Sequence, residues 1–460
     1  MYKPMIQKPA ISLRHKNAPG PHGHFLLGNA RDIQRDPLGF ALTMTRQYGD
    51  IVRMRFFTWP AYLVNHPDGV KHVLQENQRN YSKDIYPYKI FKPLLGQGLV
   101  TNNGDSWLQQ RRLMQPAFHR KRLAALGTLM TGAAVAMLDR WQDFTERNQP
   151  LDVAAEMLRL TLCIVGKALF NIDLSDEAHS VSQAVTTVNR LLSEYLYAPF
   201  PPLNVPTPRN RRIQDARRAL DQVVFGIITQ RRQQNTDAGD LLSMLLLARD
   251  EETGLGMNDQ QVRDEVMTLL IAGHETVSTA LVWAWYLLSQ YPDMERRLQI
   301  ELDTVLEGHP PAVEHLADLT YTHMVIEETL RLYPPAWVFG RKAIAGDEIG
   351  GYSIPANSII VLSPYMTHRH PAFWENPDVF DPERFTPERS AGRPHYAYFP
   401  FGGGPRICIG INFALMEMQL ILATVAQRYT LRLVPGHSVE PEALLSLRPR
   451  FGLPVTLQRR

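Results

Sequence analysis

One ten-residue segment constrains the fold of this chain more than any other: residues 401–410 read FGGGPRICIG. Three glycines and a proline form a loop that ends at Cys408, and the apolar pattern INFALMEMQLILATVAQR, typical of a helix, follows. A cysteine at the start of a helix meets unpaired backbone N–H groups and the positive end of the helix dipole. Both favour the thiolate, so the segment predicts a cysteine that binds a ligand.

The residues around Cys408 support the same interpretation. Glycines have no Cβ, so Gly402, Gly403, Gly404 and Gly410 let the backbone approach a large, flat group. Arg406 adds a fixed cation for an acidic group. Two alternatives stay open, because a single buried cysteine is usually packing and a glycine-rich loop is often only a turn. A phosphate loop is excluded, since Gly-Lys-Ser/Thr does not precede the helix.

Composition excludes several classes of protein. Hydrophobic residues make up 44% of the chain and charged residues 21%, which is the balance of a globular protein. Lys and Arg number 49 against 46 Asp and Glu, a net charge of +3, so nucleic acid is not an expected partner. Two cysteines cannot build a disulfide framework or a Cys-rich zinc site. Cys163 lies in an apolar run and is predicted to be a small buried hydrophobe.

The pattern along the chain predicts a single domain over residues 1–460. Residues 1–66 contain coil and strands, with Thr58, Trp59 and Pro60 separating two strand-like runs. Residues 67–335 are mainly helical, and residues 336–460 hold strands, a Pro-rich coil, a last helix from about 409 to 428 and terminal strands. The fold class is therefore mainly α (α+β), although 460 residues alone would suggest about three domains.

No segment offers about 20 consecutive apolar residues, so no membrane span is predicted. The first twenty residues lack the apolar core of a signal peptide, and we expect a cytoplasmic protein. Residues 199–208 hold five prolines between two helical stretches and are predicted to form a stiff loop.

A long helix is predicted over residues 258–291, with Asn258 as N-cap and Gln261 completing a capping box. Its middle, residues 272–276, reads AGHET and breaks the apolar pattern. The glycine there costs about 1 kcal/mol relative to alanine. A kink or a polar contact to a neighbouring helix would explain the segment without any functional role.

Two pairs of residues lie at helical spacing. Glu328 and Arg331 share one helix face, and so do Trp107 and Arg111. The first pair has apolar neighbours, which favours a buried ion pair over a solvated one. The alternative for the second pair is a half-buried tryptophan with the arginine stacked on it.

Residues 401–410 resemble the haem-binding signature of the cytochrome P-450 superfamily, F-x-x-G-x-R-x-C-x-G, at every specified position. The resemblance implies a helix-rich domain with small β-sheets and haem b buried between the long helix and the cysteine loop. It implies that Cys408 is the axial thiolate ligand of the iron and that Arg406 pairs with a haem propionate. Phe401, Gly402, Gly410 and Ala272 would lie against the cofactor.

The same resemblance assigns the remaining motifs, which appear in the family's order along nearly the whole chain. Gly273 would loosen the long helix, Glu275 would relay protons, and Thr276 would hydrogen-bond dioxygen or an ordered water. Trp107, Arg111 and Arg341 would bind propionates. Arg384, in the segment Pro-Glu-Arg-Phe, would complete a structural trio with Glu328 and Arg331. Substrate-pocket candidates are Trp337, Val338 and Phe339.

The implied activity is insertion of one atom of dioxygen into a lipophilic substrate, such as a fatty acid or terpenoid. No dinucleotide fingerprint is present, so NAD(P)H-derived electrons would come through a ferredoxin or flavodoxin with its reductase. We expect a monomer. A basic cluster that would dock the donor, or be only a solvated face, comprises Arg111, Arg112, Arg120, Lys121 and Arg122. A peroxide-driven peroxygenase or isomerase and a haem-binding sensor are the alternatives.

Overall fold

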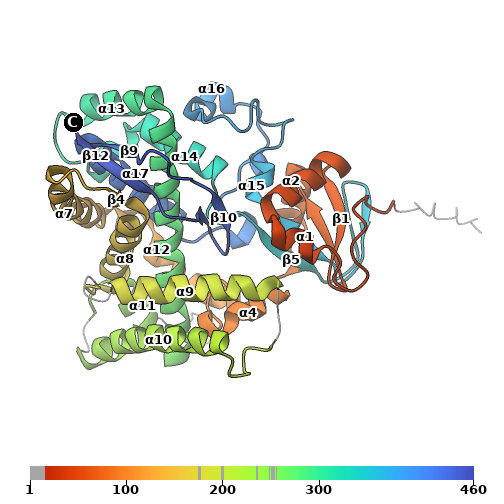
Figure 1. The fold of residues 1–460 in the computed structure, drawn as a ribbon. Coiled ribbons are helices and arrows are strands. Elements are labelled where there is room, and N and C mark those ends of the chain that lie inside the picture. Colours follow the sequence, from red (N-terminus) through yellow and green to blue (C-terminus); the bar gives the residue numbers. More distant parts are fainter. Residues whose placement is uncertain are drawn as a thin grey trace, which may run out of the picture.

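The computed structural model describes residues 16–174, 178–197, 201–234, 237–247, 249, 254 and 256–460. Of the predicted Pro-rich loop, residues 199 and 200 lie outside this part of the chain. Figure 1 shows a helix-rich body around the long helix α12 and a smaller region with strands that also carries α1 and α2. This arrangement confirms the mainly α class with small sheets.

Helix α12 (Asp259–Gln290) is the central element. Its first turn carries the predicted capping box, in which the Asn258 side chain accepts from the Gln261 N–H and the Gln261 side chain accepts from the Asn258 N–H. It ends before Pro292, which begins α13 (Pro292–Leu306). The helix is assigned as α-helix from Asp259 to Gln290 without interruption, and the loosening of this helix at Gly273 stays a prediction.

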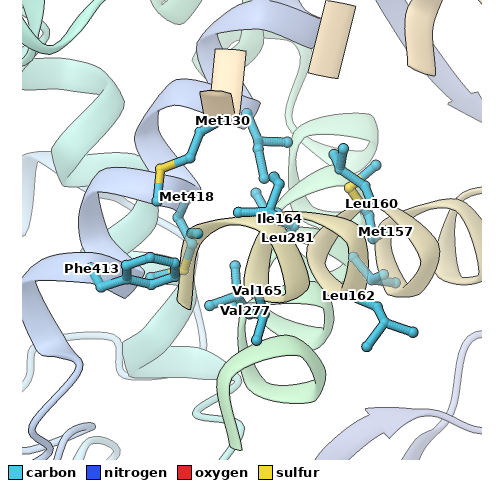
Figure 2. Packing of buried hydrophobic residues seen from close by; sticks show 14 of the residues in the cluster. Met130, Met157, Leu160, Leu162, Ile164, Val165, Val277, Leu281, Phe413 and Met418 are labelled. Atoms are coloured by element: carbon cyan, nitrogen blue, oxygen red, sulfur yellow. The ribbon is translucent and has the colours of Figure 1, made fainter. Parts of the chain in front are cut away.

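Two helices bury their apolar faces against α12: α8 (Val153–Phe170) and α17 (Ile411–Arg428). Helix α7 (Gly127–Glu146) packs in turn against α8 and α17. Figure 2 shows Val165 of α8 beside Val277 and Leu281 of α12, with Phe413 and Met418 of α17 close by. All five side chains are buried in one core. Helices α9 (Ala178–Tyr197), α10 (Pro208–Gln234) and α14 (Thr320–Leu332) pack around this core.

The largest sheet joins strands from residues 51–82 to strands from residues 339–362, in the order β1-β2-β8-β5-β3. Strands β1 (Ile51–Phe56) and β2 (Trp59–Val64) form a hairpin, and β2 runs parallel to β8 (Ile359–Leu362). Trp59 and Pro60 belong to β2 and pair with β1, so the predicted break at residues 58–60 is wrong; the turn is formed by Phe57, with φ of 52°, and Thr58.

The other strands complete the large sheet or form smaller sheets around the helices. Their bounds are β3 (Tyr81–Ser82) and β5 (Phe339–Ala343) in the large sheet, β4 (Leu151–Asp152), β9 (Tyr429–Leu433) and β12 (Pro454–Arg459) in a second, β6 (Asp347–Ile349) and β7 (Tyr352–Ile354) in a third, and β10 (Pro441–Ala443) and β11 (Leu447–Pro449) in a fourth.

The remaining α-helices are short. They are α1 (Ala30–Arg35), α2 (Pro37–Tyr48), α3 (Pro67–Lys71), α4 (Tyr86–Leu95), α5 (Gly104–Met114), α6 (Arg120–Ala124), α11 (Leu241–Leu247), α15 (Pro364–Thr367) and α16 (Pro387–Ser390). Cys163 is half-buried on α8 and packs against the main core, so it is less buried than predicted.

Two stretches of the described chain have the length and hydropathy of a membrane span, Lys121–Glu146 and Asp259–Gln290. The apolar window of the second is 83% buried, because α12 is the core helix, and that of the first is 39% buried. Length and composition alone therefore do not distinguish the core helix of this fold from a membrane-spanning helix.

The core predicts the cost of a cavity. Leu281 is 1% exposed at the centre of the packing in Figure 2. Leu281→Ala is expected to lower the free energy of unfolding by about 2–5 kcal/mol, because the neighbours cannot fill the space. Leu247→Ala, at a helical leucine that is 59% exposed, is the control and should change stability by no more than about 0.5 kcal/mol. Equal losses in urea unfolding would contradict this packing.

Candidate functional site

The loop before α17 holds Cys408 by hydrogen bonds to its backbone. The Cys408 N–H donates to the carbonyl of Phe401 at 2.9 Å, and Arg111 Nη1 donates to the carbonyl of Ile407 at 2.7 Å. The helix itself begins at Ile411 with Gly410 as N-cap. Cys408 thus lies in the turn that leads into the helix, and its thiol keeps an exposed face.

The electrostatic environment of the thiol is mixed. Desolvation by the surrounding protein raises the pKa of Cys408, whereas the N–H of Gly410 and the charge of Arg111 lower it. The net direction is upward, so the protein alone does not stabilise a free thiolate. A Lewis-acidic metal ion would deprotonate a coordinating thiol outright.

The four glycines of the loop have different roles. Gly402 has φ of +72° and a Cβ there would meet nothing within 4 Å, while one at Gly410 would approach Phe118 and Cys408 Sγ only at 3.9 and 4.0 Å. A Cβ at Gly404 would lie 1.8 Å from the carbonyl of Leu74, and one at Gly403 2.4 Å from the ring of Tyr396. Only Gly402 and Gly410 therefore leave space for another group. The prediction that Gly403 and Gly404 also let the backbone approach a large, flat group is wrong, since other parts of the protein occupy the space beside them.

Four cations converge near this loop. Burial and the charges of Arg341 and Arg111 lower the pKa of Arg406 to about 10. Burial and the charges of Arg341, Arg406 and Arg111 lower the pKa of Lys83 well below its ordinary value. Asp84, next to Lys83 in sequence, pairs instead with Lys89 and Lys342. Among the described residues no carboxylate pairs with any of the four, so the cluster favours binding of an anionic group.

The side chains of the cluster are fixed by neutral partners. Arg406 stacks on the buried indole of Trp107 at 4.0 Å and donates to the carbonyl of Asn102 at 3.1 Å and to Asn103 Oδ1 at 3.3 Å. The arginine on the indole is therefore Arg406; Arg111 reaches the cysteine loop instead. Arg341 lies 3.4 Å from the hydroxyl of Tyr88.

Sequence reasoning missed Lys83 and Tyr88. Lys83 Nζ donates to the carbonyl of Val100 at 2.8 Å and lies 5.2 Å from the ring centre of Tyr88. Both residues belong to the segment YSKDIYPY, in which the spacing carries no helical or strand signal. Only the tertiary fold brings them beside Arg341 and Arg406.

The middle of α12 carries the second half of the site. Ala272 is exposed and Gly273 and Thr276 are half-buried, whereas the rest of residues 262–285 are buried. Thr276 Oγ1 donates to the carbonyl of Ala272 at 2.7 Å. A Cβ at Gly273 would meet Val165 at 3.1 Å, so this glycine permits close contact with α8. His274 is fully buried with Nδ1 2.6 Å from the carbonyl of Leu270, and burial lowers its pKa to about 4.

Glu275 points to other elements. Its Oε1 accepts a hydrogen bond from Ser446 Oγ at 2.7 Å and another from Asn189 Nδ2 on α9. Desolvation raises the pKa of Glu275, although these two donors and the charge of Arg448 act in the opposite direction. The carboxyl group therefore keeps its proton at a higher pH than an exposed glutamate does.

Glu328, Arg331 and Arg384 come together in the interior. Glu328 accepts two bonds from Arg331, at 2.6 and 2.7 Å, and its Oε1 lies 3.3 Å from Arg384 Nε. Arg331 also donates to the carbonyls of His368, Pro377 and Val379 in the coil, at 2.9, 2.6 and 3.1 Å. These bonds tie the coil that leads to the cysteine loop onto α14.

The pocket candidates after α14 differ in their surroundings. Trp337 is buried, donates its indole N–H to the carbonyl of Leu444 at 2.8 Å, and packs with Leu38 and Leu447. Val338 and Phe339 are half-buried. Trp337 therefore has its polar atom and most of its surface committed to protein.

These residues fit a haem. The donor set is one thiol with an exposed face, four cations with no carboxylate partner in the described chain, and an exposed patch on the core helix. Thiolate suits the iron of a haem, and arginines suit the two propionates because they bind carboxylates bidentately.

Comparison with known proteins agrees with this geometry. A family model described as Cytochrome P450 matches residues 18–454. The chain belongs to the cytochrome P450 family. A cytochrome P450DA heme domain of known crystal structure superposes with a TM-score of 0.88 and 28% sequence identity, covering 97% of this chain and 98% of that one. This P450 therefore binds haem through a cysteine thiolate and is an oxidoreductase that incorporates oxygen.

Three bacterial relatives cover most of the P450. A cyclooctatin synthase from Streptomyces melanosporofaciens is 39% identical over 96% of this chain and 95% of its own. A cyclooctat-9-en-7-ol 5-monooxygenase from the same organism is 38% identical over 89% and 88%. A pentalenene oxygenase from Streptomyces avermitilis is 36% identical over 92% and 93%.

The buried trio predicts a large loss of stability. Glu328→Gln removes the charge that compensates two buried guanidinium groups, so the P450 is expected to lose about 3–5 kcal/mol of unfolding free energy. The matched control is Asp293→Asn, which breaks an exposed pair with Arg296 and should cost less than about 1 kcal/mol. Urea unfolding of the two variants measures both. Similar costs would show that the Glu328 cluster is not a stabilising element.

Proposed function

We propose that this cytochrome P450 is a monooxygenase that inserts one atom of dioxygen into a terpenoid or similar lipophilic molecule, with Cys408 as the axial ligand of haem b. The observation that carries the proposal is the convergence of the exposed Cys408 thiol with the four cations that lack carboxylate partners. Two of the bacterial relatives are named for the terpenoids cyclooctatin and pentalenene, and these names support the substrate class.

Haem supplies the redox chemistry of oxygen activation, and thiolate ligation favours O–O cleavage. The chain's own residues hold and orient it: Cys408 from one loop, Arg406 and Lys83 toward the propionates, with Arg341 beside them. Trp107 stacks on Arg406 and fixes the guanidinium in place. Phe401 secures the Cys408 backbone through its carbonyl.

The exposed patch on α12 faces the reacting molecules in this proposal. Ala272 leaves room, and Thr276 can turn its hydroxyl from the Ala272 carbonyl to an ordered water or to dioxygen. Glu275 would then help relay protons from solvent. Val338 and Phe339 offer half-buried apolar surface for a hydrocarbon skeleton. Trp337 supports them through its bond to Leu444.

Electrons require a separate donor, a ferredoxin or flavodoxin with its NAD(P)H-dependent reductase. The exposed basic side chains here are Arg112 at the end of α5 and Lys121 and Arg122 in α6. They lie close in sequence to Arg111, which contacts the cysteine loop. The side chain of Arg120 lies outside the described residues. We place the donor on this basic face because such donors carry acidic surfaces. The enzyme would act as a monomer in the cytoplasm.

A haem binding and turnover test decides the proposal. The reduced carbonyl complex of the holoenzyme should show the spectrum of thiolate ligation, which Cys408→Ala should abolish while Cys163→Ala keeps it. Cyclic terpene hydrocarbons should shift the haem from low to high spin, and turnover with a ferredoxin, reductase and NADPH should give hydroxylated products. Thr276→Ala should raise peroxide at the expense of product. Turnover by peroxide with no response to any donor would instead favour a peroxygenase.

The docking face has its own test. Arg112→Glu combined with Lys121→Glu is expected to raise the donor's apparent KM several-fold, since opposite charges steer association, while the haem spectrum stays unchanged. Raising the ionic strength should reduce the difference between variant and wild type. Reversal of two distant exposed arginines, Arg211 and Arg212, is the control for net charge. Unchanged donor kinetics would remove this face from the proposal.

A further inference from the structure

Three consecutive ionisable residues lie buried near the start of the core helix. They are Arg263, Asp264 and Glu265, which are 3%, 4% and 0% exposed. Arg263 donates to the carbonyl of Leu94 at 2.8 Å. The Asp264 carboxylate accepts from the Gln97 N–H at 2.8 Å. These bonds tie the end of α4 and the residues after it to α12, beside which α4 lies in Figure 1.

Glu265 makes the third bond to the same segment. Its Oε2 accepts from the Leu99 N–H at 3.0 Å, whereas its Oε1 accepts no bond from the residues that the structure describes. Burial raises the pKa of Glu265 to about 8, with the charge of Asp264 acting in the same direction and the Leu99 N–H against it. A buried carboxyl group is costly, so its one bond indicates that the position of the Leu99 backbone matters.

The residues after Leu99 hold two of the four cations near the cysteine loop. Lys83 Nζ donates to the carbonyl of Val100 at 2.8 Å. Arg406 donates to the carbonyl of Asn102 at 3.1 Å and to Asn103 Oδ1 at 3.3 Å. Asn103 Oδ1 also accepts from the backbone N–H of Lys83 at 3.0 Å. Both cations therefore take their positions from this short segment.

The turn between the two sets of contacts is closed by its own hydrogen bonds. The carbonyl of Gly98 accepts from the N–H groups of Thr101 and Asn102, both at 3.0 Å. Thr101 Oγ1 donates to the carbonyl of Gly96 at 2.7 Å. A Cβ at Gly98 would collide with Thr268 Oγ1, so the turn packs directly against α12. A shift of the turn away from α12 would move the carbonyls that hold the cations.

We infer that Glu265 is a positioning residue for the haem, because its bond to the Leu99 backbone sets where Lys83 and Arg406 lie for the propionates. The inference rests on the proposed role of these cations toward the propionates, and it assigns their placement to the core helix. A cation beside the haem attracts the propionates and favours the ferrous state, since reduction adds negative charge. Loss of the Glu265 bond should therefore weaken haem binding and lower the reduction potential.

The test follows haem transfer from the holoenzyme to excess apomyoglobin, together with the reduction potential of the haem. Glu265→Leu is expected to raise the rate of haem loss about threefold to tenfold, the effect of losing one hydrogen bond, and to lower the potential. Glu265→Gln should stay near wild type in both measurements. Its amide oxygen can accept from the Leu99 N–H, and with a pKa of about 8 the native carboxyl is mostly neutral at pH 7.

Two further variants separate this bond from general damage to the helix. Thr268→Val removes a buried hydroxyl that has no partner among the described residues, three positions along α12, and should change neither readout. Gly98→Ala forces the turn away from α12 from the opposite side and should act in the same direction as Glu265→Leu. Should Glu265→Leu yield no folded holoenzyme, Gly98→Ala makes the same comparison.

A Lys83→Met background tests whether Glu265 acts through the cations. There, Glu265→Leu should add less than half of its effect on both readouts, because one of the cations that it positions is already lost. Equal effects in the two backgrounds would overturn the inference. So would a Glu265→Gln variant that behaves as Glu265→Leu does, or wild-type values in both Glu265→Leu and Gly98→Ala.

Failure of the proposed function looks different. If the cations did not bind the propionates, Lys83→Met would itself leave haem loss and the reduction potential unchanged. If Cys408 were not the haem ligand, the wild type would lack the spectrum of thiolate ligation. The inference alone fails where the wild type shows that spectrum and Lys83→Met has its effect, but Glu265→Leu and Gly98→Ala have none.

Discussion

The buried ion pairing of the Glu328 carboxylate with two arginines is the interaction on which the rest of the site depends. It accepts both strong bonds from Arg331 and faces Arg384, with no exposed surface. An ion pair of this kind adds little net stability, but removal of one member leaves charges unpaired in a low dielectric. Arg331 uses its remaining donors on coil carbonyls. The coil is therefore fixed to the helix core, and the coil in turn fixes the position of the cysteine loop.

The two halves of the site are built by different physics. Backbone bonds and glycine conformations shape the cysteine loop, with Gly404 able to approach Leu74 only because it lacks a Cβ. The opposite half is a stretch of an uninterrupted helix whose apolar residues bury it against α8 and α17. The cysteine loop is also bonded to the segment around α5, since Arg111 donates to the carbonyl of Ile407 and Arg406 donates to the carbonyl of Asn102.

Much of the fold could be predicted from sequence because its signals are local. The capping box at Asn258, the helix pattern after Cys408 and the strand runs of residues 51–64 all depend on neighbours in the chain. The errors arose where tertiary packing decided. Gly403 and Gly404 face protein instead of a ligand, because Tyr396 and Leu74 occupy the space beside them. Trp59 and Pro60 join a strand since β1 pairs with them.

The sequence by itself determined the family through residues 401–410, because ligand type and loop geometry require those residues at that spacing. It also placed Glu328 and Arg331 on one helix face. Only the tertiary structure decided which distant groups meet: Lys83 joins the arginines from a segment with no periodic signal, and Glu275 turns to Asn189 and Ser446. Spacing along a chain fixes the direction of a side chain from its own element, but its partner depends on how separate elements pack.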